Sequence, residues 1–80
     1  MDRNDVEKRV TKVVCQVLGC DADIVKSESH FVFDLGAEST QSVELVAAFE
    51  GEFHIEMDED SALEVQTVGG AVDYISKFVI

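Results

Sequence analysis

The segment DLGAEST contains the residue of this chain that is best placed to do chemistry, Ser39. It directly precedes an apolar segment with helical spacing, so we expect its hydroxyl at the N-terminal end of a helix. The unpaired N–H groups and the dipole at that end of a helix favour an anionic group. The pattern therefore predicts either a serine that bears an anionic group or a serine that only caps the helix.

The neighbours of Ser39 do not support a catalytic role. The nucleophile elbow of many hydrolases requires G-x-S-x-G, and the sequence AESTQ at 37–41 contains neither glycine. A serine nucleophile also needs an adjacent general base, and no pattern brings His30 or His54 to it. We therefore expect that the protein is not an enzyme.

The sequence predicts no metal site. Cys15, Cys20, His30 and His54 could bind zinc, but their spacing matches no known zinc motif. Acidic residues cluster at 58–64, but the glycine at position six and the glutamate at position twelve of an EF-hand loop are missing. The two cysteines do not form a disulfide framework in a cytosolic chain, and Cys15 is expected as a small buried residue within a helix.

The composition describes one small and strongly acidic domain. Hydrophobic residues make up 46% of the 80 residues, which is enough for a core despite a net charge of −11. Residues 1–33 carry five basic and six acidic side chains, whereas residues 34–80 carry one basic and eleven acidic ones. This negative half disfavours nucleic acid and favours basic protein surfaces, unless the acidity serves only solubility.

The same sequence contains no run of eighteen apolar residues and no basic-then-apolar leader. We therefore expect a cytoplasmic protein that does not enter a membrane, and we expect it to be a monomer.

Helical spacing begins near the N-terminus. A first helix is predicted over residues 4–18, with a capping box of Asn4 and Glu7 at its start and Gly19 at its end. Its apolar face is a valine pattern at positions 6, 10, 13, 14 and 17. Residues 19–37 are then expected to form a long loop that is ordered by its own apolar anchors.

The second half of the chain predicts three further helices. The second spans 39–52, the third is short and runs from the capping residue Asp58 to about Val65, and the last is capped by Thr67. The apolar stripe of the second helix comprises Val43, Val46, Phe49 and Phe53, widened by Leu45. The inward face of the last helix comprises Val68, Ala71, Val72, Ile75 and Phe78. The expected fold is an all-α four-helix bundle, with three main helices and one short helix, forming a single domain over 1–80.

The segments FVFDLGAEST, QSVELVAAFEGEF, IEMDED and TVGGAVDYI resemble an acyl carrier protein. The resemblance runs from the first helix to Ile75, nearly the whole chain. It implies that Ser39 is esterified by 4′-phosphopantetheine, whose terminal thiol carries acyl groups as thioesters. The family motif D-S-L is replaced here by Glu38-Ser39-Thr40, which indicates a specialised carrier for fatty-acid, lipid or polyketide-type biosynthesis.

The resemblance also implies a docking face and an acyl pocket. The acids Glu44, Glu50 and Glu52 would steer a phosphopantetheinyl transferase and acyl-transferring or acyl-modifying enzymes that have basic docking surfaces. The expected docking residues are Glu38, Thr40, Val43, Glu44, Ala47 and Glu50. The expected pocket residues are Val46, Phe49, Met57, Ala62, Val68 and Ala71.

Two alternatives remain at this point. The chain could be an unmodified carrier-like module, in which Ser39 only caps the second helix and the acidic face binds a protein partner. It could also be a peptidyl carrier, which we rank lower because such carriers usually show a G-G-x-S-L-like motif and less acid.

Overall fold

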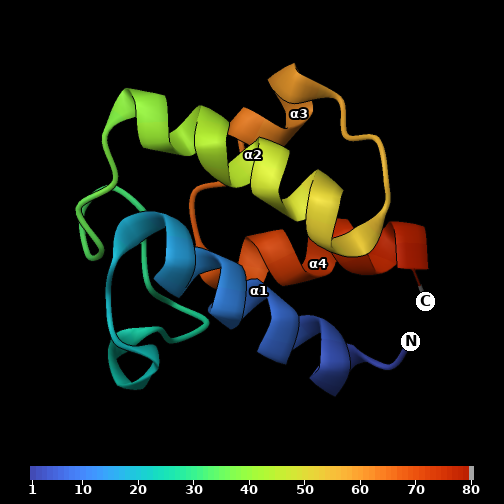
Figure 1. Ribbon diagram of the computed structural model, residues 1–80, viewed down its shortest axis with the longest axis horizontal. Coiled ribbons are helices and arrows are strands. Elements are labelled where there is room, and N and C mark those ends of the chain that lie inside the picture. The colour runs from blue at the N-terminus through green and yellow to red at the C-terminus, as the bar shows by residue number, and fades with distance from the viewer. Residues whose placement is uncertain (80) are drawn as a thin grey trace.

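A computed structural model describes residues 1–79, which form an all-α bundle with a long connection between the first two α-helices (Figure 1). The elements in chain order are α1 (Arg3–Leu18), the single 3₁₀ turn η1 (Ala22–Ile24), α2 (Ser39–Phe53), α3 (Glu59–Leu63) and α4 (Val68–Val79). The fold predicted from helical spacing is confirmed, with three main helices and one short one. Extended pairing within the described residues is limited to one isolated antiparallel bridge, between His30 and Thr67.

Helix α1 begins earlier than predicted. The carboxylate of Asp2 accepts a hydrogen bond from the Asp5 N–H at 2.9 Å, so Asp2 caps the helix. The capping box predicted at Asn4 is wrong because Asn4 lies within the first turn. The predicted end is confirmed: Gly19 has a left-handed φ of 69°, and its N–H donates to the Cys15 carbonyl at 2.9 Å.

The core forms where α1 packs against both α2 and α4. Figure 1 shows α2 above α4, with the blue α1 ribbon running beside α4 and with α3 beside α2. The most deeply buried side chains are Val6, Val10, Val14, Val72 and Ile75. Burial of such aliphatic side chains contributes about 1.5–3 kcal/mol each to the free energy of unfolding.

Two apolar residues that were predicted to face inward lie at the surface instead. Val43 and Phe78 are each 47% exposed. Helix α2 buries Leu45, Phe49 and Phe53, which follow one another at four-residue spacing, and Val43 lies off that line. Phe78 packs its ring against another aromatic ring of α4, with the centroids 5.5 Å apart.

The connection between α1 and α2 (residues 19–38, the connecting loop) is ordered by its own packing, as predicted. Phe31 inserts its ring into the core and is only 7% exposed. The buried hydroxyl of Ser29 accepts from the Lys26 N–H at 3.0 Å. Three backbone hydrogen bonds join this loop to the start of α4: Phe31 N–H to Gln66 O at 2.9 Å, Val68 N–H to Ser29 O at 3.0 Å, and Gly69 N–H to Ser27 O at 2.8 Å.

The caps of the last two helices are confirmed. The Asp58 carboxylate accepts from the Ser61 N–H at 3.4 Å and from the Ser61 hydroxyl at 2.8 Å. Helix α3 ends at Leu63, slightly before the predicted end near Val65. The Thr67 hydroxyl accepts from the Gly70 N–H at 3.1 Å at the start of α4. Among the helices of residues 1–79, none has the length and apolar character needed to span a membrane.

We predict that Gly69→Ala and Gly51→Ala will have opposite effects on stability. A Cβ at Gly69 would lie 3.0 Å from the Ser27 carbonyl oxygen, whereas a Cβ at Gly51 would meet nothing within 4 Å. Overpacking at Gly69 should cost about 1–2 kcal/mol. Better helix propensity at Gly51 should add about 0.5–1 kcal/mol. Urea unfolding monitored by circular dichroism measures both effects, and a stabilised Gly69→Ala protein would contradict the close packing of this loop on α4.

Candidate functional site

Ser39 is the first residue of α2, and Glu38 occupies the cap position before it. The backbone of Glu38 is extended, with φ −85° and ψ 167°, and its N–H donates to the Gln41 side-chain oxygen at 2.9 Å. The expected capping role of Ser39 is therefore wrong, because Glu38 takes the cap position. Within residues 1–79 the exposed Ser39 hydroxyl makes no hydrogen bond with another group of the protein. The helix start does not depend on this hydroxyl.

A tight turn in the connecting loop leads to Ser39. The Asp34 carboxylate accepts from the His30 N–H at 2.7 Å, and the Asp34 N–H donates back to the His30 carbonyl at 2.9 Å. Gly36 adopts a left-handed φ of 74°, and the Ala37 N–H donates to the Phe31 carbonyl at 2.8 Å. The turn therefore closes directly on the buried Phe31 and fixes where α2 begins.

The imidazole of His30 also belongs to this turn. Its Nδ1 accepts from the Val32 N–H at 3.1 Å and from the Phe33 N–H at 3.2 Å. These two hydrogen bonds hold the ring against the backbone of the turn. Sequence reasoning considered His30 only as a ligand or a base and assigned no separate role to Asp34. A turn could have been predicted from the sequence, because Asp34 follows His30 by four residues and Gly36 comes shortly after.

Most of the expected docking residues lie exposed on α2. Glu38, Thr40, Val43, Glu44 and Ala47 are all at the surface. Glu50, the sixth expected docking residue, is half-buried instead. Its carboxylate accepts a hydrogen bond from the Met57 N–H at 2.9 Å, so it contributes to the fold.

Glu52, which was also expected to steer partners, faces α1 instead. Its carboxylate lies 3.4 Å from the Lys12 ammonium and 3.7 Å from the Arg9 guanidinium. These contacts neutralise part of the acidity of α2 on the side that faces α1. The exposed acids of the first two turns, Glu38 and Glu44, keep their negative charge directed at solvent.

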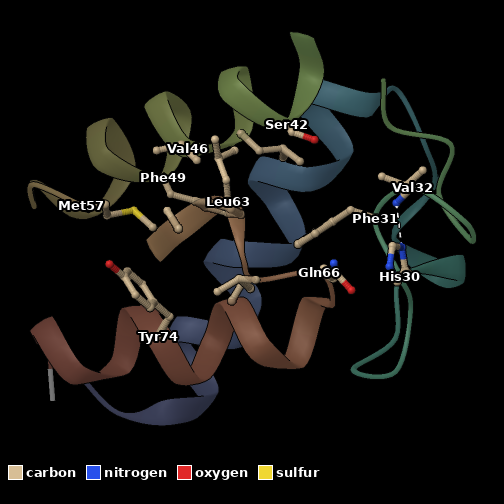
Figure 2. A pocket seen from close by; sticks show the side chains of 14 residues that line it. His30, Phe31, Val32, Ser42, Val46, Phe49, Met57, Leu63, Gln66 and Tyr74 are labelled. Carbon is tan, nitrogen blue, oxygen red and sulfur yellow. Dashed lines mark hydrogen bonds between the residues drawn. The ribbon is translucent and has the colours of Figure 1, made fainter. Parts of the chain in front are cut away.

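A cavity of about 80 Å³ lies between α2, α3, α4 and the connecting loop (Figure 2). The structure brings five of the six expected pocket residues to its wall: Val46, Phe49, Met57, Ala62 and Ala71. Val68 is not among the lining residues and is buried in the core, where its N–H binds the connecting loop. Sequence reasoning missed the other lining residues, among them Leu45, Leu63 and Val65.

Four polar side chains reach the same cavity. Figure 2 shows Tyr74 and Met57 at one end and His30 with Val32 at the other. Ser42 lies at the wall near the start of α2, about one turn beyond Ser39. Gln66 lines the side formed by the segment before α4. The cavity therefore extends from the neighbourhood of Ser39 into the bundle.

The two cysteines lie half-buried against the core. Burial raises the pKa of the Cys15 thiol, and the nearby Cys20 and Asp21 raise it further. The Cys15 thiol is therefore protonated at neutral pH and is a weak nucleophile. Within the described part of the chain, no three His, Cys, Asp or Glu side chains come together as a metal site would require.

Comparison with known protein families now identifies the class of this chain. Residues 8–75 match the family model described as the phosphopantetheine attachment site. The chain belongs to this family, and the resemblance to acyl carrier proteins is confirmed. Its cofactor is a covalently attached 4′-phosphopantetheine, and domains of this family interact with transferases and acyl-handling enzymes.

We predict that Asp34→Ala will loosen the turn that precedes Ser39. The substitution leaves the His30 N–H without its charged acceptor, so the free energy of unfolding should fall by about 1 kcal/mol. Glu28→Ala is the matched control, because Glu28 is an exposed acid of the same loop and its removal changes the net charge equally. Chemical denaturation of both variants measures the difference, and equal stabilities would show that Asp34 does not hold the turn.

Proposed function

We propose that the protein carries acyl intermediates as thioesters on a 4′-phosphopantetheine arm attached to Ser39. We further propose that it is a specialised carrier in fatty-acid, lipid or polyketide-type biosynthesis. The observation that carries the proposal is the exposed serine hydroxyl at the first position of α2, which has no structural contact within residues 1–79. The family membership of the chain supplies the chemistry for such a serine.

The groups around Ser39 fit a phosphodiester. The N–H groups of the first turn of a helix have no intrahelical partner, and Glu38 uses its own N–H on the Gln41 side chain. The N–H groups of Ser39 and Thr40 therefore remain available to a phosphate, and the helix dipole favours its negative charge there by about 0.3–1 kcal/mol. The neighbouring Glu38 carboxylate opposes this attraction.

The residues of the chain position the arm and supply no reactive group. The attached arm supplies a thiol that holds the acyl group as a thioester. Asp34 and His30 hold the turn before α2, and Gln41 holds the cap residue Glu38, so the Ser39 hydroxyl occupies a fixed place at the surface. This arrangement agrees with a carrier that is not itself an enzyme.

The cavity is proposed to shelter the start of the acyl chain. Its walls are mostly apolar, and Ser42 places one of its edges near the attachment residue. A cavity of about 150 Å³ holds a benzene molecule, so the 80 Å³ found here suits only a few methylene groups. A longer chain would require the five-residue helix α3 to move away from α2.

The acidic surface of α2 is proposed to receive the partner enzymes. Glu38 and Glu44 present negative charge beside Ser39, and basic surfaces on a phosphopantetheinyl transferase and on acyl-handling enzymes would complement them. Single exposed ion pairs contribute only about 0–1 kcal/mol, so such docking is fast and reversible. We propose that the protein does this as a cytoplasmic monomer with one domain over residues 1–80.

Because the motif Glu38-Ser39-Thr40 departs from the family's D-S-L, one alternative must be tested. In this alternative the protein is an unmodified module of the same fold that binds a protein partner through α2. The two functions differ in whether Ser39 is needed. In the carrier, Ser39 is the attachment point. In the unmodified module, it is an exposed side chain without a role, because Glu38 takes the cap position.

We predict that co-expression with a broad-range phosphopantetheinyl transferase will add the mass of one arm to the protein. Ser39→Ala should abolish this gain, whereas Thr40→Ala and Ser42→Ala should keep it, because only the Ser39 hydroxyl is both exposed and at the first helical position. Intact-mass spectrometry measures all four proteins. An unmodified wild-type protein, or a modified Ser39→Ala protein, would contradict the proposed attachment site.

A further inference from the structure

Phe33 exposes an aromatic ring to solvent in the turn that leads to Ser39. Its side chain is 84% exposed, more than any other large apolar residue of residues 1–79 that lies at the surface. Val32 beside it is 47% exposed. Single exposed apolar residues are common, but two exposed neighbours in the turn that leads to Ser39 form an apolar patch that a partner can cover.

The backbone under this patch is held firmly. The N–H groups of Val32 and Phe33 both donate to His30 Nδ1, and the Gly36 N–H donates to the Val32 carbonyl at 3.1 Å. The ring of Phe33 lies 4.4 Å from the His30 ring, measured between centroids. The turn therefore presents the ring in a fixed position, so less conformational entropy is lost when a partner binds.

The patch and the attachment residue belong to the same region of the surface. Val32 and Ser42 line the same cavity, and Ser42 lies about one helical turn after Ser39 (Figure 2). A standard protein interface covers about 800 Å² per partner, or a patch about 30 Å across. The whole bundle measures 28 × 26 × 18 Å along its principal axes, so an enzyme that reaches Ser39 covers most of this face.

The charge around the patch indicates what kind of partner surface can bind there. Residues 27–76 contain no lysine or arginine. Asp34 and Glu38 are exposed acids that follow the patch within five residues, and Glu44 is an exposed acid on α2. A second copy of this chain, with its own net charge of −11, would be repelled, and so would an anionic lipid surface. A basic protein surface is attracted.

We propose that Phe33 is the aromatic anchor for the enzyme that attaches the arm to Ser39, and that this enzyme presents an apolar pocket bordered by lysine and arginine. The inference rests on the proposed function and adds a residue outside the expected docking set. The donor is a nucleotide joined to 4′-phosphopantetheine through a diphosphate. In the transfer, the Ser39 Oγ forms a bond to the phosphorus on the pantetheine side, and the phosphoanhydride bond from that phosphorus to the nucleotide breaks, so the nucleotide leaves. The hydroxyl proton passes to a base of the enzyme. Because that base must lie within reach of Ser39, the enzyme must dock over this residue.

Steady-state kinetics of arm transfer by a broad-range phosphopantetheinyl transferase test the proposal. Phe33→Ala should raise KM for the carrier at least about tenfold and leave kcat within about twofold, because the ring contributes to docking and not to the reaction. Phe33→Tyr should restore KM, since it keeps the ring. Phe78→Ala is the matched control, as Phe78 is another exposed aromatic residue on α4, and its KM should equal that of the wild type.

Ionic strength separates the apolar anchor from the acidic surface. The effect of Glu44→Lys on KM should shrink as salt screens exposed charges, with a Debye length of about 10 Å at 0.1 M and about 3 Å at 1 M. The effect of Phe33→Ala should persist at high salt. Loss of the Phe33→Ala effect in salt would overturn the apolar contact.

The remaining outcomes distinguish this inference from the proposed function. An unmodified wild-type protein would overturn both, whereas equal KM values for wild type and Phe33→Ala would overturn the anchor alone. A dimer or binding to lipid vesicles that Phe33→Ala abolishes would show that another occupant covers the patch, and would overturn the choice of the transferase.

Discussion

The position of Ser39 depends on the attachment of the connecting loop to the start of α4. Three backbone hydrogen bonds make this attachment, and the ring of Phe31 anchors the same loop in the core. Because the Ala37 N–H binds the Phe31 carbonyl, the start of α2 is tied to that anchor. The site is thus a surface position on a fixed backbone, although it follows a connection of about twenty residues without a long element.

The acidic residues of the chain have two different roles, and the net charge does not show which acid has which role. Asp34 and Glu50 accept backbone N–H groups, and Glu52 lies between the basic groups of α1. These acids stabilise the fold. Glu38 and Glu44 remain at the surface beside Ser39, where their field acts on an approaching partner. The proposed docking face is therefore smaller than a count of acids on α2 would indicate, and in our proposal the exposed ring of Phe33 adds apolar area to it.

The sequence was sufficient for the features that depend on local spacing. The valine pattern placed α1, Gly19 ended it, and Asp58 and Thr67 capped the last two helices, because each signal acts within about four residues. Features that depend on contacts across the chain could not be predicted in this way. Val68 was expected in the pocket, but its N–H binds a carbonyl some forty residues earlier, which turns the start of α4 toward the connecting loop. Backbone hydrogen bonds between distant segments leave no periodic pattern of side chains in the sequence, so they cannot be predicted from it.

Native-state hydrogen exchange tests most directly whether the connecting loop belongs to the folded core. The amide protons of Phe31, Val68 and Gly69 make the loop contacts, and that of Val14 in the middle of α1 serves as the reference for global unfolding. The account predicts that all four exchange with similar free energies of opening, because the loop should release only when the bundle unfolds. Rapid exchange of the first three with a protected Val14 would contradict it, since Ser39 would then sit on a loop that opens independently.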